Sequence, residues 1–531
     1  MTENLIIFNT RVVTPLGFSA RCGKEMEQLS IIDNATVEVT DGIITYVGPN
    51  RGEERDGYYQ HYWHYNARGK CLLPGFVDSH THFVFGGERA EEFSWRLKGE
   101  SYMSIMERGG GIVSTVKVTR ACNFIQLRSK AEGFLKQMSA MGVTTVEGKS
   151  GYGLDKETEL LQLRVMRSLN NDEHKRVDVV STFLGAHAVP AEYNGQTDEY
   201  VDYIIREVMP VVVHNNLAEF CDVFCEQGVF SIEQSRRLLL AAKEMGLALK
   251  LHADEIVPLG GAGLAAELSA VSADHLLHAS DADIHAMADK GVVATLLPLT
   301  AFALKEPYAR GREMIDAGCA VALATDLNPG SCFSGSIPLT IALACIYMQM
   351  SIEETITALT LNGAAALQQH VQGGAVAGHE LQLAEGGRVV AGLFQILLVN
   401  ADRDRRVRIA QVAVFFKRIA DDFNGFLIIA AAAVEQRAYS IGRCGVYGVC
   451  AAALQGVHPA RELFGVFAAQ VVEQSFQIAG DQNIHGRRNG GIKRALFVVR
   501  TGADKIRQHV VAIRRADKLV HRQTHALCIV G

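Results

Sequence analysis

Two histidines, His80 and His82, follow an apolar run in the sequence Leu-Leu-Pro-Gly-Phe-Val-Asp-Ser-His-Thr-His, which covers residues 72–82. Alternate residues of a β-strand point to the same face, so the two imidazoles can converge on one cation. Imidazole is a ligand that suits zinc and iron. A pair with this spacing is also common as surface polarity at a strand end, so by itself it predicts half of a metal site.

His252 and Asp326 are the residues that would complete this site. Three neutral imidazoles and one carboxylate make a nitrogen and oxygen site for a single Zn or Fe ion that leaves room for water. The ion would lower the pKa of that water towards neutrality. Asp326 lies in an Asp-x-Asn-Pro-Gly sequence, which is also good turn chemistry, but we favour a metal ligand and proton acceptor.

Two further residues could carry protons or charge near the ion. Glu255 stands three residues after His252, where a strand gives way to a loop, and could exchange protons with a ring nitrogen of a substrate. His275 could orient the water and polarise a carbonyl group, although a satisfied core histidine is the alternative. We interpret Asp254 as a solvated loop or helix-start acid and His278 as structural.

Apolar, strand-like runs alternate with longer helical patterns between Leu72 and about Leu367. Eight such runs occur, at residues 72–77, 143–147, 177–184, 220–224, 248–251, 271–277, 292–297 and 321–324. This alternation predicts an α/β fold, a (β/α)8 barrel of the TIM type over residues 71–367, whose active site lies at the C-terminal ends of the strands. These ends carry the residues His80, His82, Lys149, His187, His252, His275 and Asp326.

A small β-domain is predicted before the barrel, over residues 1–70. Its β-rich runs cover residues 5–8, 36–39 and 43–47, and the Asp41-Gly42 pair between the last two is a strong hairpin signal. We expect a small antiparallel, sandwich-like domain.

The composition changes abruptly after about Leu367. Residues 368–531 contain 21 Lys and Arg against 12 Asp and Glu, whereas the preceding residues contain 31 Lys and Arg against 46 Asp and Glu. Residues 368–531 also contain no Met or Trp. Neither a helical nor a strand period holds for long in residues 389–434. We therefore expect residues 368–531 to be a basic segment of unknown structure that is foreign to the barrel, through a shifted reading frame or a gene fusion.

The composition of the whole chain is that of a soluble globular protein. Its hydrophobic content of 48%, charged content of 21% and net charge of -6 make no case for nucleic acid as a partner. The N-terminus lacks a basic region followed by an apolar core, and the apolar stretches are too short to cross a bilayer. The 11 cysteines include no CxxC pair. We expect a cytoplasmic protein with a small-molecule partner and no membrane partner.

From about Leu5 to Leu367 the chain resembles the amidohydrolase superfamily and, within it, the imidazolonepropionase family. The run at residues 72–82, the His252-x-x-Glu255 pair, His275 and Asp326 are shared with cytosine and related deaminases. The narrower resemblance rests on Gly-Gly-Glu-Arg-Ala-Glu-Glu-Phe at 86–93, Gly-Gly-Gly-Ile at 109–112, Gly-Lys-Ser-Gly-Tyr-Gly-Leu at 148–154, Phe-Leu-Gly-Ala-His at 183–187 and Ala-Thr-Asp-Leu-Asn-Pro-Gly at 324–330.

This resemblance implies a set of binding residues. One divalent ion, zinc or iron, would be held by His80, His82, His252 and Asp326. The resemblance also implies substrate or product contacts for Arg89, Tyr152, His187, Glu255, Asn328 and Gly330, and Ser331 stands where the family usually has threonine. A carboxylate on the substrate calls for a bidentate cation such as Arg89, although a surface ion pair for Arg89 and a packing role for Tyr152 are the alternatives.

The implied reaction is hydrolysis of the ring of 4-imidazolone-5-propanoate to N-formimidoyl-L-glutamate in histidine degradation, with Glu255, His275 and Asp326 as catalytic residues. Deamination of a nucleobase-like ring needs the same groups but no arginine for a carboxylate, so Arg89 separates the two. A third alternative is a non-catalytic chain. Its barrel could be disabled, because the family's closing strands are not found after Leu367, or its basic tail could bind nucleic acid. We leave open whether the chain forms a homodimer.

Overall fold

The computed structural model describes residues 4–369 except residues 42, 52–60, 101–103, 105–107 and 174. The predicted foreign segment, residues 368–531, therefore lies almost entirely outside the described residues. Within the described part of the chain, no helix combines the length and apolar character that crossing a membrane requires.

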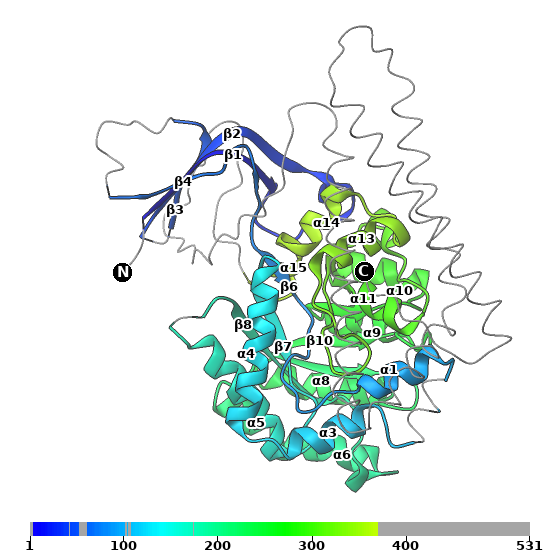
Figure 1. Ribbon diagram of the computed structural model, residues 1–531. Coiled ribbons are helices and arrows are strands. Elements are labelled where there is room, and N and C mark those ends of the chain that lie inside the picture. Colours follow the sequence, from blue (N-terminus) through cyan, green and yellow to red (C-terminus); the bar gives the residue numbers. More distant parts are fainter. Residues whose placement is uncertain are drawn as a thin grey trace, which may run out of the picture. The chain divides into compact units, whose positions relative to one another are not determined.

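Eight parallel strands form a barrel, as the alternation of apolar runs predicts (Figure 1). Each strand pairs with the next along the chain, in the order β6 (Phe76–Asp78), β7 (Val143–Lys149), β8 (Asp178–Ala186), β9 (Phe220–Cys225), β10 (Ala248–Ala253), β11 (Ser272–His275), β12 (Val293–Leu296) and β13 (Val321–Leu323). The predicted α/β barrel is thus confirmed.

The run predicted at residues 72–77 is split, which corrects one expected strand. Pro74 cannot donate a ladder hydrogen bond, so the strand is interrupted there. Cys71–Leu72 forms β5, which pairs with the N-terminal sheet, and only Phe76–Asp78 enters the barrel as β6.

The barrel is closed between β6 and β13 by residues at the ends of these strands. The Asp78 carboxylate accepts hydrogen bonds from the backbone N and Oγ1 of Thr325, at 2.8 and 2.6 Å. The backbone N of Asp326 donates to the carbonyl oxygen of His80 at 2.9 Å. The first and last strands are therefore joined beside the proposed metal ligands.

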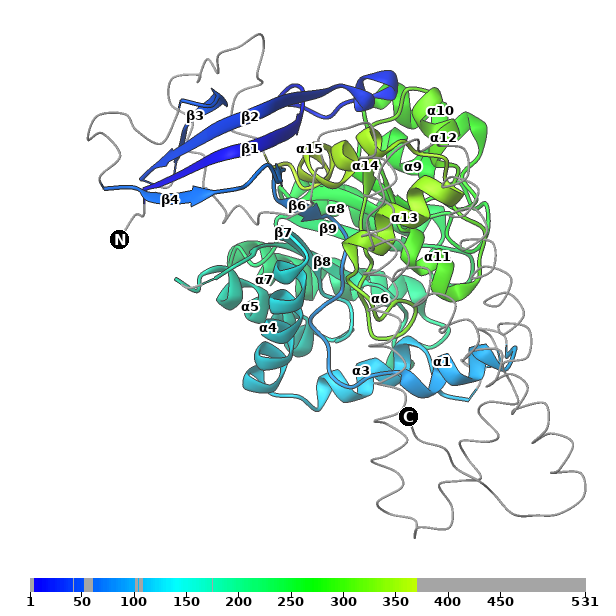
Figure 2. The same ribbon diagram turned by 45° about the horizontal axis from the view of Figure 1, so that its top comes forward.

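Helices surround the strands (Figure 2). They are α1 (Ala90–Leu97), α3 (Ile112–Arg120), α4 (Phe124–Ala140), α5 (Lys156–Asn170), α6 (Thr197–Tyr203), α7 (Met209–His214), α8 (Ile232–Glu244), α9 (Gly261–Leu268), α10 (Asp281–Lys290), α11 (Pro298–Leu304), α12 (Gly311–Asp316), α13 (Ile337–Tyr347), α14 (Ile352–Leu359) and α15 (Leu361–Ala365).

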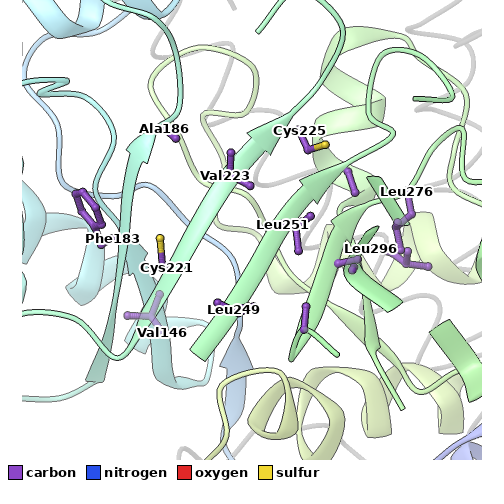
Figure 3. Packing of buried hydrophobic residues seen from close by; sticks show 14 of the residues in the cluster. Val146, Phe183, Ala186, Cys221, Val223, Cys225, Leu249, Leu251, Leu276 and Leu296 are labelled. Atoms are coloured by element: carbon purple, nitrogen blue, oxygen red, sulfur yellow. The ribbon is translucent and has the colours of Figure 1, made fainter. Parts of the chain in front are cut away.

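Strand alternation divides the side chains of the barrel into two sets. On β10, Leu249, Leu251 and Ala253 belong to the main hydrophobic core between strands and helices, which Figure 3 shows in part. Lys250 and His252 alternate with them and are buried on the other face of the strand. A two-residue period therefore places apolar groups towards the helices and charged or metal-binding groups inside the barrel.

A second, smaller core lies at the opposite end of the barrel from the histidines. Val77, Val180 and Phe220 pack there with Ala364 and with Leu367, which is fully buried. These strand residues precede the site-bearing ends of their strands, so the segment after α14 packs against the N-terminal end of the barrel. Leu367 is thus an integral part of the core.

The N-terminal residues form one five-stranded sheet of β1 (Leu5–Pro15), β2 (Leu29–Thr40), β3 (Ile43–Pro49), β4 (Trp63–Asn66) and β5. The expected hairpin is present, because Thr40 pairs with Ile43 and Asp41 has a left-handed φ of 51°. The structure does not have the expected antiparallel, sandwich-like arrangement, because β4 and β5 run parallel to β1 in one mixed sheet. These two strands return to β1 only after β2 and β3, and that long connection permits parallel pairing. The domain boundaries themselves stay a prediction.

Candidate metal centre

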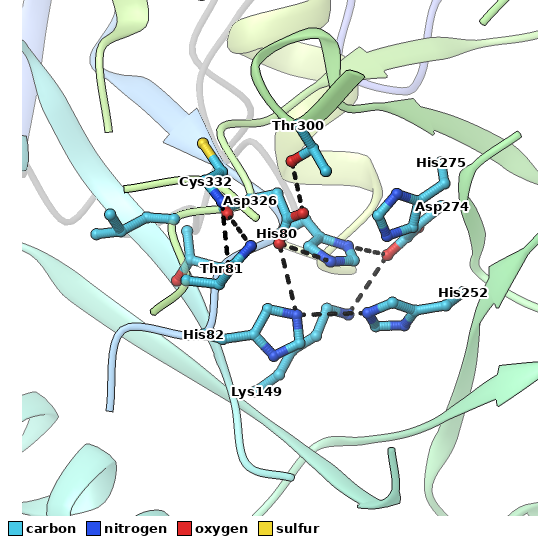
Figure 4. A network of polar contacts seen from close by, with 12 residues as sticks. His80, Thr81, His82, Lys149, His252, Asp274, His275, Thr300, Asp326 and Cys332 are labelled. Atoms are coloured by element: carbon cyan, nitrogen blue, oxygen red, sulfur yellow. Dashed lines mark hydrogen bonds and ion pairs between the residues drawn. The ribbon is translucent and has the colours of Figure 1, made fainter. Parts of the chain in front are cut away.

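Three histidines and one aspartate converge where β6, β10 and β13 end (Figure 4). The Nε2 atoms of His82 and His252 are 3.4 Å apart, and Oδ1 of Asp326 lies 3.6 Å from Nε2 of His82 and 3.7 Å from Nε2 of His80. His80, His82 and His252 each offer one ligand atom within 4.8 Å of the others. The structure therefore brings together all four predicted ligands.

The chemical state of the histidines fits a metal ion. Burial lowers the pKa of His80, His82 and His252 well below its ordinary value, so the rings are neutral, as metal ligands must be. Nε2 of His80 is buried without a hydrogen-bond partner among the described residues. A buried acceptor of this kind, facing two other imidazoles, is what a bound cation would satisfy.

Asp326 is held with one oxygen towards the histidines. Its other oxygen, Oδ2, accepts a 2.6 Å hydrogen bond from Oγ1 of Thr300. Its backbone has a left-handed φ of 51°, which an aspartate adopts more readily than most residues. Burial raises the pKa of Asp326 to about 7.

Glu255 and His275 lie together beside the predicted ligands. Oε1 of Glu255 is 3.5 Å from Nδ1 of His275, and a ligand atom of His275 lies within 4.8 Å of those of His80 and Asp326. Burial lowers the pKa of His275 to about 4, and burial and neighbouring carboxylates raise that of Glu255 well above its ordinary value. The histidine is therefore neutral near pH 7, and the glutamate is able to keep a proton.

The backbone at His275 is strained. His275 and Leu276 have φ values of 75° and 60°, in the left-handed region that such residues rarely adopt. These two residues lie where β11 ends, next to the predicted ligands His80 and Asp326.

A cavity of about 530 Å³ is lined by three of the four predicted ligands, His82, His252 and Asp326. All seven predicted substrate or product contacts line it, namely Arg89, Tyr152, His187, Glu255, Asn328, Gly330 and Ser331. These residues are far apart in the sequence, so their convergence is a property of the fold. Their individual roles stay predictions.

His187 and Tyr152 form an aromatic wall next to the ligands. The His187 ring stacks on that of His82 with a centroid distance of 5.0 Å and an interplanar angle of 17°, and the Tyr152 ring lies 5.2 Å from His187. Burial lowers the pKa of His187 to about 4, and Nδ1 of its neutral ring is 3.0 Å from the carbonyl oxygen of Gly151. If Nδ1 donates this bond, Nε2 is left as an acceptor.

Arg89 provides a buried cation in the same cavity. The residue is 8% exposed, and its Nε has no hydrogen-bond partner among the described residues. Nη1 lies 3.7 Å from Oε2 of Glu92, a long contact. The guanidinium group therefore retains hydrogen-bonding capacity for an anionic ligand.

The Asn328 side chain organises the loop after β13. Its Oδ1 accepts hydrogen bonds from the backbone N of Gly330 and of Ser331, both at 2.8 Å, and its Nδ2 donates to the carbonyl oxygen of Asp326 at 2.8 Å. The amide thus fixes the loop between the ligand Asp326 and the wall formed by Gly330 and Ser331.

Sequence reasoning missed a layer of charged residues beneath the ligands. Glu147, Asp222, Lys250 and Asp274 are all fully buried, and Lys149, which was noticed as a strand end, belongs to the same layer. Charged residues are almost never fully buried unless paired. A signal was present in the sequence, because Lys250 stands alone in an apolar strand two residues before His252 and therefore shares its face.

Comparisons with known proteins agree with this geometry. Residues 71–377 match the family model described as "Amidohydrolase family". The imidazolonepropionase of Bacteroides thetaiotaomicron is 83% identical over 369 residues, which cover 70% of this chain and 88% of the relative. The imidazolonepropionase of Clostridium tetani is 60% identical over 365 residues, which cover 68% of this chain and 87% of the relative.

Solved structures of lower identity share the fold. A 5-methylcytosine deaminase from Klebsiella pneumoniae liganded with phosphonocytosine has a TM-score of 0.52 at 16% identity, covering 70% of this chain and 89% of that one. A triazine hydrolase variant has a TM-score of 0.52 at 15% identity, and the match covers 72% of this chain and 86% of the triazine hydrolase chain. At these identities the likeness extends to the fold alone.

Proposed function

Because the chain belongs to the imidazolonepropionase family of the amidohydrolases, we propose that it hydrolyses 4-imidazolone-5-propanoate to N-formimidoyl-L-glutamate, a step of histidine degradation. The observation that carries this proposal is a cavity that joins a cluster of metal-ligand type to a buried arginine, Arg89, whose Nε has no hydrogen-bond partner within the described part of the chain. The ring and the carboxylate of this substrate require these two features together.

We propose that one divalent ion, zinc or iron, is held by His80, His82, His252 and Asp326. When bound, such an ion supplies Lewis-acid chemistry, which lowers the pKa of a water molecule and polarises a carbonyl group. The donors that support this assignment are three neutral imidazoles and a carboxylate oxygen left free by Thr300.

The chain's own residues would bind and orient the substrate. Arg89 would bind the propanoate group through its guanidinium N–H groups. Tyr152 and His187 would contact the ring next to His82, and Asn328, Gly330 and Ser331 would hold the product against the loop after β13. Fixing both the ring and the tail would place the ring carbonyl carbon beside the ligands.

Glu255, His275 and Asp326 would then move or stabilise charge. Asp326 would accept a proton from the attacking water molecule while the oxygen of that water forms a bond to the ring carbonyl carbon. The neutral His275 would donate a hydrogen bond to the carbonyl oxygen while negative charge develops there. Glu255 would protonate the ring nitrogen as the bond between this nitrogen and the carbonyl carbon breaks.

The test is an assay of ring opening on imidazolone propanoate, with metal analysis of the same sample. We expect formimidoyl-glutamate to form in proportion to bound metal. Cytosine serves as the comparison substrate, because a deaminase would leave Arg89 without a ligand. Release of ammonia from cytosine together with no ring opening would favour the deaminase alternative and overturn the proposal.

We further propose that the enzyme acts in the cytoplasm on a small carboxylate-bearing substrate, without nucleic-acid or membrane partners. The composition and net charge of the chain support this proposal. Light scattering after size-exclusion chromatography would measure the mass of the particle and so show whether the chain forms a homodimer.

A further inference from the structure

Five charged side chains lie fully buried beneath the proposed ligands, and the proposed reaction uses none of them. They are Glu147, Lys149, Asp222, Lys250 and Asp274, from β7, β9, β10 and β11. Burying charges carries a large desolvation penalty, so an apolar layer would fill the same space at less expense to stability. A layer of this kind therefore calls for a role in the site above it.

Lys149 is the centre of this layer. Its Nζ lies 2.6 Å from Oδ2 of Asp222, 3.4 Å from Oδ2 of Asp274 and 3.0 Å from Oε2 of Glu147. One ammonium group thus contacts carboxylates from two other strands of the barrel. Figure 4 shows its position below His82 and next to Asp274.

The same two aspartate oxygens also contact the proposed metal ligands. Oδ2 of Asp274 is 2.6 Å from Nδ1 of His80. Oδ2 of Asp222 is 3.0 Å from Nδ1 of His252, within contact distance but without the alignment of a hydrogen bond. Each oxygen is therefore shared between Lys149 and one histidine ligand.

Other donors fix the second oxygen of each carboxylate. Oδ1 of Asp222 accepts from the backbone N of Val223 at 2.7 Å and of His252 at 3.1 Å. Oδ1 of Asp274 accepts from Oγ of Ser272 at 2.6 Å. Both carboxylates are thus anchored on one side, and each Oδ2 faces Lys149 and one histidine. Oδ2 of Asp274 also lies 4.0 Å from Nζ of Lys250, a longer contact than the 3.4 Å to Lys149.

We propose that Lys149 is a positioning residue that sets the orientation of two metal ligands at once, His80 through Asp274 and His252 through Asp222. A carboxylate at Nδ1 keeps the proton on that nitrogen, so Nε2 of each ring is presented as the ligand atom. The ammonium group holds both carboxylates in place. This inference rests on the proposed metal centre, but its readout is metal affinity rather than ring opening.

The test compares Lys149→Met with Lys250→Met in the full chain. Lys250 is equally buried in the same layer, but its Nζ contacts Glu147 and the carbonyl oxygens of Ser79 and Ala366, and it lies 4.0 Å from Asp274. Both variants lose a buried ammonium group, so both should have a lower melting temperature. Only Lys149→Met removes the group that contacts both aspartates.

We expect Lys149→Met to weaken the binding of Zn²⁺ to the metal-free protein by about 10- to 100-fold, measured by competition with a chelator. Lys250→Met should weaken it by about twofold or less. The visible spectrum of bound Co²⁺ should change in Lys149→Met and stay as in the wild type in Lys250→Met. Equal losses of Zn²⁺ affinity in the two variants, or none in Lys149→Met, overturn the proposal.

Asp222→Asn is the second variant, in case Lys149→Met does not fold. It keeps the size of the side chain and removes the charge between Lys149 and His252, so Zn²⁺ affinity should again fall by about 10-fold or more. Wild-type affinity in this variant also overturns the proposal. Failure of the proposed function is distinguishable, because the wild-type chain would then bind metal without opening the imidazolone ring.

Discussion

Gly330 lies so close to Arg89 that a Cβ atom at position 330 would overlap Nη2, Cζ and Nε of the guanidinium group. The backbones of the two segments are also joined, since the N of Arg89 donates to the carbonyl oxygen of Pro329 at 3.2 Å. The loop that carries Asp326 therefore also sets the place of the arginine. This packing fixes the distance between the proposed anion site and the proposed metal centre.

Gly330→Ala should displace the arginine without unfolding the protein, because the atoms in the way belong to the far end of a flexible side chain. We expect KM for imidazolone propanoate to rise about tenfold, or roughly 1.4 kcal/mol, with a smaller change in kcat. Gly335→Ala is the matched control, since the nearest atom to its Cβ would be Cγ of Met138 at 3.6 Å. An unchanged KM in Gly330→Ala would show that Arg89 does not bind the substrate.

Arg89→Met should remove the partner of the propanoate and leave the metal ligands in place. Loss of a buried, charge-assisted pair should lower kcat/KM, and the corresponding loss of transition-state stabilisation should be roughly 2 to 5 kcal/mol. The control is an imidazolone with an uncharged ethyl group in place of the propanoate, which should react equally with both proteins. If the variant loses activity on both substrates alike, the carboxylate is bound elsewhere.

Glu255→Gln should retain the metal ion and lose activity, because Glu255 is proposed to carry a proton and not to bind the ion. We expect kcat to fall by about 10²- to 10⁴-fold with unchanged metal content. Glu306→Gln makes the same substitution at an exposed residue of the same cavity. Its charge makes the smallest of the contributions that raise the pKa of Glu255, so this variant should lower kcat far less than Glu255→Gln does. Loss of metal from Glu255→Gln would instead identify the residue as a ligand.

His82→Ala and Asp326→Ala should each lose most bound metal and nearly all activity, as expected when one of four donors is removed. The wild-type chain should bind one equivalent, measured by elemental analysis. His278→Ala serves as the histidine control and should keep its metal. Full occupancy in His82→Ala or Asp326→Ala, or two equivalents in the wild type, would contradict the proposed single-ion site.

The barrel and the residues at the ends of its strands could be predicted from the sequence. Both features are local: a two-residue period marks a strand, and the residue types at its end are read directly from the chain. His80, His82, His252 and Asp326 could therefore be proposed as ligands before any contact was known. The motifs around Arg89 and Tyr152 added the family, which the comparisons confirmed.

The charged layer and the strand pairing of the N-terminal sheet, in contrast, depend on contacts between residues that are distant in the sequence. Lys149 and Asp274 are separated by 125 residues, and nothing local to either indicates that they meet inside the barrel. The parallel pairing of β4 and of β5 with β1 likewise depends on which strand is adjacent in space. A sequence specifies which face of a strand a residue occupies, but its partner across the barrel is set by the closure of all eight strands.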